Sequence, residues 1–176
     1  MPLKPVILPT PSEELEWLKI REGLKRCIEA VAPTARVYER WPLKFEVSET
    51  AELLMSENDN GRIHSWIIGI SQAVPKNDRS GTGNGLILWD LTVRIWGFIG
   101  YEYGIDSDNP QNELENECRK IVQVIEKNRL DLNMETSGAL KEVGMLEFRD
   151  IDTKGFGQDT IIVAEGEIEI TTKEVL

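Results

Sequence analysis

The feature that most constrains the fold is a run of alternating side chains between Leu86 and Tyr103. Successive side chains of a β-strand point to opposite faces, so a period of two predicts a half-buried strand and excludes a helix. At about 3.3 Å per residue, this strand exceeds the usual length. Gly97 and Gly100 fall inside it and predict a bend or a bulge. The apolar odd positions are Ile87, Trp89, Leu91, Val93, Ile95, Ile99, Tyr101 and Tyr103.

Two other segments show helical spacing instead. The first follows a capping box at residues 10–13, and its apolar side chains recur every three or four positions from Trp17 to Val31. The second begins at the N-cap Asn109, with proline in the first helical position, and its apolar stripe runs from Leu114 to Ile125. Both patterns predict amphipathic helices that bury one face.

The remaining segments predict shorter strands and long loops. Residues 36–41, 63–72, 145–151 and 160–172 have strand composition, and residues 152–157 have hairpin-loop chemistry. Residues 42–61 and 73–85 are expected to be long loops, the first with a helical turn at 50–55, and residues 128–144 are expected to be irregular. The order α-β-β-β-α-β-β predicts one α+β domain over residues 1–176. Residues 1–9 of this domain are expected to form an N-terminal arm. Its sheet should be mostly antiparallel, with two main helices on one face, a long central strand and a C-terminal hairpin.

Charge and length exclude several classes of protein. The chain has 176 residues, 31 acidic and 20 basic side chains, a net charge of −11 and a pI of about 4.7. A general nucleic-acid binder needs a basic face, and an anionic membrane surface would repel this chain. The sequence has no signal-peptide pattern and no uncharged apolar window of 18 residues, so we expect no membrane association.

Candidate catalytic and metal-binding patterns are weak. His64 is the only histidine and is expected on a strand surface, while Cys27 and Cys118 lie on the two apolar helical stripes and are expected in the core. The glycine-rich residues 81–85 precede a strand, whereas a phosphate loop follows one. Residues 106–111 and 150–155 lack essential calcium ligands. We therefore predict no catalytic residue, metal or cofactor, and no enzyme activity.

Two groups of residues are candidates for surface roles. Glu165, Glu167 and Glu169 alternate with apolar residues on the last strand. This acidic face is either simply solvated or, as a hypothesis, lines a channel through which a polyanion passes without binding. Most of the five tryptophans should build the core, but aromatic residues are also common interface anchors. The interface candidates are Trp41, Trp96, Phe98 and Tyr101.

The order of elements resembles the tail terminator, or tail completion, proteins of long-tailed bacteriophages. The resemblance rests on the leading helix at 17–31, the short strand ending near Trp41, the central strand at 86–103, the helix at 109–127 and the closing hairpin at 145–172. The segment at 42–85 is unusually long for this plan. The family has no catalytic motif, so the resemblance transfers no site residue.

The resemblance implies a structural virion protein, assembled in the host cytoplasm and located in the tail neck. Such a protein forms a ring, usually a hexamer, that caps the tail tube, ends its polymerisation and joins it to the head connector. Its expected partners are further copies of itself, the tail tube protein, the connector or neck proteins, and the sheath terminus where the tail is contractile. DNA would pass without specific binding. The alternatives are a small α+β enzyme or ligand-binding domain, and a tail-assembly chaperone or adaptor.

Overall fold

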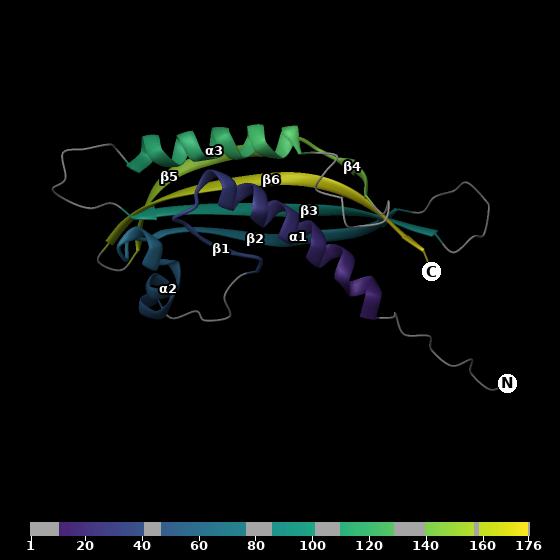
Figure 1. Cartoon of the computed structure of the whole chain (residues 1–176), viewed down its shortest axis with the longest axis horizontal. Helices are drawn as coiled ribbons and strands as arrows, with labels where there is room; N and C mark the ends of the chain where they lie inside the picture. Colours follow the sequence, from purple (N-terminus) through teal and green to yellow (C-terminus); the bar gives the residue numbers. More distant parts are fainter. Residues whose placement is uncertain are drawn as a thin grey trace.

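The computed structural model describes residues 11–40, 47–76, 86–100, 110–128, 140–156 and 159–175. They form one six-stranded sheet with the helices α1 and α3 on one face (Figure 1). The helices are α1 (Pro11–Val31), α2 (Val47–Leu54), the 3-10 helix η1 (Glu57–Asp59) and α3 (Pro110–Lys127). The strands are β1 (Arg36–Tyr38), β2 (His64–Lys76), β3 (Leu86–Gly100), β4 (Leu140–Val143), β5 (Glu147–Phe156) and β6 (Asp159–Val175).

The sheet follows the order β1-β2-β3-β6-β4, and β5 also pairs with β6. Among the strands of the described residues, only the β1–β2 pair is parallel. The two longest strands, β3 and β6, pair without interruption from Leu86↔Val175 to Gly100↔Ile161. β4 and β5 pair with successive parts of β6 and form the edge opposite β1 and β2. The α+β class, the mostly antiparallel sheet and the C-terminal hairpin are confirmed.

The main core lies between the sheet and the two long helices. It takes the odd positions of β3 and the even positions of β6, as the alternation predicts, and the apolar stripes of α1 and α3. Cys27 and Cys118 are both buried in it, as expected. Its largest fully buried side chain is Trp66, whose ring packs edge to face on Phe148 at 5.9 Å between centroids.

A second, smaller cluster covers the opposite face of the sheet at one end. There α2 lies over the sheet and buries Leu54. The expected loop at 42–61 was therefore wrong for residues 47–59, which contain α2 and η1, although the helical turn predicted at 50–55 overlaps α2. α2 has only eight residues, about two turns, which is too short for a clear periodic signal. The buried members of the cluster are Leu54, Ile63, Ile67, Phe98, Ile161 and Val163.

Strand boundaries also differ from the prediction. β2 continues to Lys76, so residues 73–76 of the expected loop at 73–85 are strand, and residues 77–85 lie outside the described residues. β4 lies in the segment expected to be irregular. β5 and β6 stay paired as far as Phe156↔Asp159, where hairpin-loop chemistry predicted a loop from residue 152. β1 ends at Tyr38. These strands gain their stability from neighbours across the sheet, which local composition does not show.

The predicted bulge near Gly97 was placed in the wrong strand. The pairing shifts in β2, between Ile70 and Gln72, and the Ser71 hydroxyl donates a hydrogen bond to the backbone oxygen of Thr92 beside the shift. Gly97 has a packing role instead. A Cβ there would lie 2.6 Å from Cη2 of Trp66, so only glycine lets that ring lie against β3.

Candidate functional site

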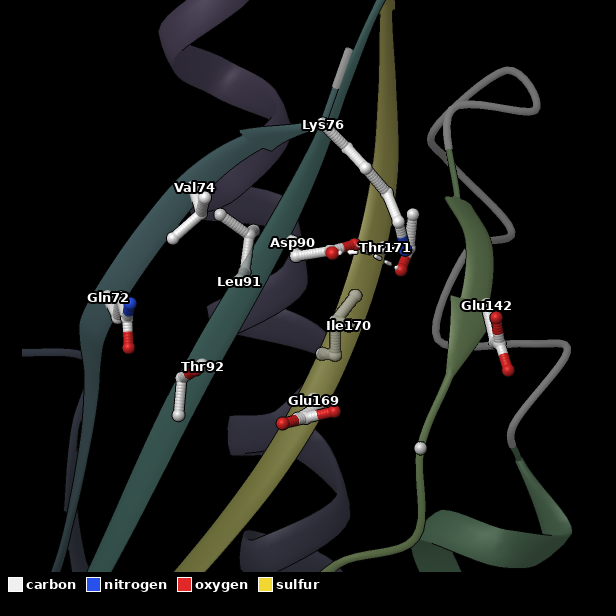
Figure 2. Close-up of a pocket in the computed structure, with 11 residues that line it drawn as sticks. Gln72, Val74, Lys76, Asp90, Leu91, Thr92, Glu142, Glu169, Ile170 and Thr171 are labelled. Carbon is white, nitrogen blue, oxygen red and sulfur yellow. Dashed lines mark hydrogen bonds and ion pairs between the residues drawn. The ribbon is translucent and has the colours of Figure 1, made fainter. Parts of the chain in front are cut away.

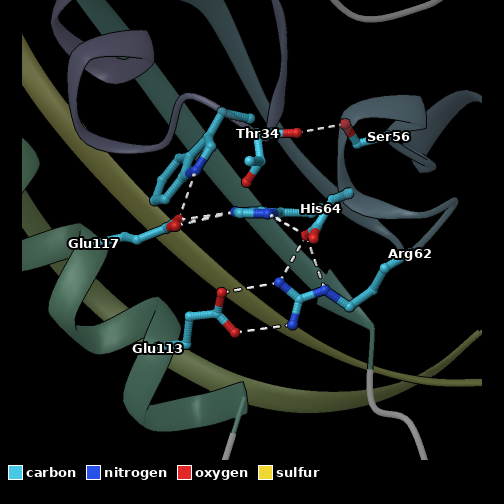
Figure 3. A network of polar contacts seen from close by, with 8 residues as sticks. Thr34, Ser56, Arg62, His64, Glu113 and Glu117 are labelled. Carbon is cyan, nitrogen blue, oxygen red and sulfur yellow. Dashed lines mark hydrogen bonds and ion pairs between the residues drawn. The ribbon is translucent and has the colours of Figure 1, made fainter.

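The densest group of polar contacts in the described part of the chain surrounds His64 (Figure 3). His64 is the first residue of β2, and its side chain lies on the helix-covered side of the sheet, beside the first turns of α3. The chain reaches β2 through a tight turn after η1, where Asn60 and Gly61 have φ values of 53° and 76°. This left-handed pair reverses the chain and brings Asp59 alongside Arg62 and His64.

His64 bridges two carboxylates from different elements. Its Nδ1 lies 2.8 Å from Oδ2 of Asp59, and its Nε2 lies 3.1 Å from Oε1 of Glu117 on α3. The indole Nε1 of Trp66 also donates to Glu117, at 3.1 Å. His64 is 1% exposed, so the expected strand-surface histidine is in fact buried. The reason is tertiary, because α3 covers this end of β2 and supplies an acidic partner.

Arg62 forms the second half of the network. Its Nε and Nη2 donate to Oδ2 of Asp59 at 2.9 and 2.7 Å. Its Nη1 and Nη2 donate to the two carboxylate oxygens of Glu113, both at 2.9 Å. The bidentate geometry with Glu113 is the strong form of an arginine–carboxylate contact. The network therefore ties η1 and the start of β2 to α3.

The protonation states follow from this geometry. Burial alone would lower the pKa of His64, but the hydrogen bonds and charges of Glu117 and Asp59 outweigh it and raise that pKa. Burial raises the pKa of Asp59, but the hydrogen bonds from Arg62 and His64 lower it by more. The hydrogen bond to Glu113 raises the pKa of Arg62 further above its normal range. The folded network thus favours two cations beside three carboxylates.

This arrangement suits a structural tie better than chemistry on a substrate. Both ring nitrogens of His64 already face carboxylates, which leaves neither free to act as a general base. His64, Glu113 and Glu117 do offer ligand atoms within 4.8 Å of one another, a spacing that a metal ion can bridge. A metal would have to displace the His64 proton and the Arg62 guanidinium, because metal ligands must be deprotonated and free.

Glu165, Glu167 and Glu169 lie on the sheet face that points away from α1 and α3. On the neighbouring strands, Arg94 lies 3.7 Å from Glu165 and 3.2 Å from Glu167, and Arg149 lies 3.2 Å from Glu167. Glu169 is exposed. The acidic row is thus partly neutralised by arginines, most strongly at Glu167.

At the Glu169 end of this row, the same face carries a shallow polar hollow of about 370 Å³ (Figure 2). It is lined by the ends of β2, β3, β4 and β6. Asp90 accepts a hydrogen bond from the Thr171 hydroxyl at 2.8 Å and pairs with Lys76 at 3.1 Å. These two partners lower the pKa of Asp90. The hollow is open, and the contacts of Asp90 with Thr171 and Lys76 are of the kind found on solvated surfaces.

Of the four aromatic interface candidates, two lie outside the described residues and two pack in or against the cluster under α2. Trp41 and Tyr101 lie outside the described residues. Phe98 is 7% exposed and belongs to the cluster under α2, and Trp96 packs partly buried against the same cluster. In this structure Phe98 is therefore a core residue and not a surface anchor.

The two cysteines are poor nucleophiles. Burial raises the pKa of Cys27. Burial, with the nearby charge of Glu117, raises the pKa of Cys118 to about 12. Reactive cysteines need the opposite environment, in which the thiolate is stabilised.

Sequence reasoning missed Asp59, Arg62, Glu113 and Glu117 as partners of His64. One signal was available for α3, because Glu113 and Glu117 are four residues apart and share a helix face. Nothing in the sequence linked that face to β2.

No known family model and no curated protein matches the chain. In the described part of the chain, no helix is long and apolar enough to cross a membrane.

Proposed function

We propose that this protein is a structural subunit of a bacteriophage tail neck, which caps the tail tube as a ring and ends its polymerisation. The carrying observation is the architecture: α1 and α3 cover one face of a mostly antiparallel sheet that closes with a hairpin. This is the order of elements on which the resemblance to tail terminator proteins rests. In the assembled virion, the ring would join the tube to the head connector.

The exposed sheet face supports the same proposal. Past the end covered by α2, that face carries Glu165, Glu167 and Glu169 over β6, with Arg94 beside them on β3. The chain as a whole has a net charge of −11. A surface of this kind repels the DNA backbone more than it attracts it, so DNA can pass without being held.

The histidine network favours this structural role over the enzyme alternative. Its groups are buried or half-buried, and they satisfy one another across α3, η1 and β2. Such a network fixes η1, β2 and α3 relative to one another. A rigid subunit of this kind suits a protein whose role is to form contacts with neighbouring subunits.

The proposed partners are further copies of the chain, the tail tube protein and the connector proteins. In a contractile tail, the end of the sheath would be a fourth partner. DNA would be a passing contact only. The proposed location is the neck of the virion, after assembly in the host cytoplasm.

The test is a capping experiment. Purified protein is added to polymerising tail tube subunits, and tube length and tube ends are examined by negative-stain microscopy. The proposal expects shorter tubes with ring-shaped density at one end, and native mass spectrometry should show a closed oligomer, about six copies. Unchanged tube lengths with bare ends, at protein concentrations above those of the tubes, would contradict it.

A further inference from the structure

Three side chains of the network around His64 direct ligand atoms toward one point (Figure 3). One such atom from each of His64, Glu113 and Glu117 lies within 4.8 Å of the other two. Ligand atoms on one zinc ion are about 3.4 Å apart, because the bonds are about 2.1 Å long and the angles tetrahedral. Nε2 of His64 and Oε1 of Glu117, 3.1 Å apart, already have this spacing. Glu113 therefore needs to approach them by at most about 1.4 Å.

The groups behind these ligands are arranged as they are in metal sites. Histidines that bind a metal through one ring nitrogen usually donate the other N–H to a carboxylate. Here Nδ1 of His64 lies 2.8 Å from Oδ2 of Asp59, which leaves Nε2 for the metal. The indole Nε1 of Trp66 donates to Oε2 of Glu117 at 3.1 Å, which orients that carboxylate and leaves Oε1. The two most buried ligands are thus held in position by groups that a metal would not displace.

Arg62 is the group that a metal would displace from Glu113. Its guanidinium also donates to Asp59 from Nε and Nη2, at 2.9 and 2.7 Å, so it keeps a charged partner when Glu113 turns away. The side chain of Glu113 is 34% exposed, and that of Arg62 is 22% exposed. A partly exposed ion pair contributes much less free energy than a set of metal–ligand bonds, so the metal can replace this contact.

The charge of the network also favours a divalent cation. The carboxylates of Asp59, Glu113 and Glu117 face only Arg62 and a protonated His64, which leaves one negative charge unbalanced. A divalent ion that replaces the Nε2 proton of His64 adds two positive charges and removes one. The network then becomes neutral, which is the favourable state for charged groups with little exposure to water.

We propose that His64, Glu113 and Glu117 bind a zinc ion that joins β2 to α3, with water in the fourth position. Imidazole nitrogen selects zinc over magnesium and calcium, which prefer oxygen ligands. The partly exposed side chain of Glu113 marks the side from which the ion enters. This departs from the sequence-based expectation of no metal, which looked for histidine and cysteine spacings. The inference goes beyond the proposed function and does not depend on it.

Isothermal titration calorimetry tests the site in the full-length chain. Protein freed of metal is titrated with zinc chloride, and we expect one ion per chain with a Kd at least about tenfold lower than that for magnesium. Glu113→Gln should raise the zinc Kd at least about tenfold, because it removes a charged ligand. Glu115→Gln removes the same charge from an exposed position of α3 and should change the Kd less than about twofold. Circular dichroism checks that both variants are folded. Equal zinc affinities for the two variants would overturn the proposal.

Nuclear magnetic resonance of the imidazole ring locates the ion. His64 is the only histidine in the chain, so its ring nitrogen signals need no assignment by mutation. Saturating zinc should shift the Nε2 signal strongly, while Nδ1 keeps its proton and its contact with Asp59. Calorimetric zinc binding with an unchanged Nε2 signal would place the ion elsewhere on this acidic chain and refute the site, as would the absence of zinc binding.

Discussion

Between pH 6 and pH 8, His64 is the side chain whose protonation should dominate the pH dependence of stability. Its folded pKa is raised, so its contribution is fully present below the unfolded pKa of about 6.5 and is lost as pH rises through the folded pKa. We therefore expect the free energy of unfolding to fall between pH 6 and pH 8. Above that range, the raised pKa values of the buried thiols Cys27 and Cys118 add a loss of their own. Urea unfolding from pH 6 to pH 8 measures the change.

His64→Gln supplies the control for this prediction. The substitution leaves Asp59 and Glu117 without their shared cation, so we expect it to destabilise the fold by about 2–4 kcal/mol near pH 6. Because His64 is the only histidine, the variant should also lose most of the slope between pH 6 and pH 8. A slope that survives in the variant would mean that another group titrates there.

Gly97 tests the tight contact between β3 and the Trp66 ring. A Cβ at this position would lie 2.6 to 2.9 Å from three carbons of that ring, which is fixed in the core. Gly97→Ala should therefore destabilise the fold by about 1–3 kcal/mol, the usual effect of overpacking. Gly155→Ala on β5 is the matched control, because a Cβ there meets nothing within 4 Å. Equal unfolding midpoints for the two variants would contradict this role of Gly97.

These residues show where sequence reasoning reached its limit. The lone histidine and the glycine inside a strand both stood out in the sequence, but their partners did not. His64 meets Glu117 across 53 positions, and Gly97 meets Trp66 across the sheet. A pattern within one segment cannot reveal such contacts, because they depend on how elements pack.

The elements themselves were predictable when their pattern was long. α1, α3 and β3 each have at least fifteen residues and a strong period, and the sequence located all three. α2 and β4 have eight and four residues, too few for a period to emerge. Their positions are fixed instead by tertiary contacts, as when the Tyr38 hydroxyl donates to the backbone oxygen of Leu53 in α2.

The ion pair between Arg62 and Glu113 should anchor the first turns of α3. Glu113→Gln weakens the bidentate contact, and because both side chains are partly exposed we expect a modest loss of about 1 kcal/mol. Hydrogen exchange of the amides in the first two turns of α3 should become faster. Glu115→Gln, an exposed position on the same helix, is the control and should leave that exchange unchanged. Equal protection in both variants would show that packing alone holds this end of α3.

The molecule as a whole presents two chemically different faces. One is occupied by α1 and α3, and the other, beyond α2, is covered by no helix in the described part of the chain and carries the acidic row. The alternating side chains of β3 and β6 predicted one apolar and one polar face of the sheet. They did not predict the arginines that partly neutralise the acidic row. The proposed neck role rests on the order of elements, whereas the surface charge only suggests which face DNA would meet if that proposal is right.

Charge reversal on that face tests the assignment of a DNA-facing surface. Glu165 and Glu169 are the better targets, because Glu167 lies between Arg94 and Arg149 and its reversal would strain the fold. In Glu165→Lys/Glu169→Lys, the face becomes basic, so assembled rings should retain double-stranded DNA at low salt and slow its ejection. The reason is that added lysines bind phosphates and release counterions.

The matched control moves the same charge to the helical side. Glu29 and Glu115 are exposed on α1 and α3, and Glu29→Lys/Glu115→Lys changes the net charge by the same amount. DNA retention and ejection rate are measured for both double variants in 50 mM and 200 mM salt. If the sheet face meets DNA, only the sheet-face variant should retain it, and the effect should fade at the higher salt. Equal retention by both variants would show that net charge alone governs the effect, and that this face does not line the passage.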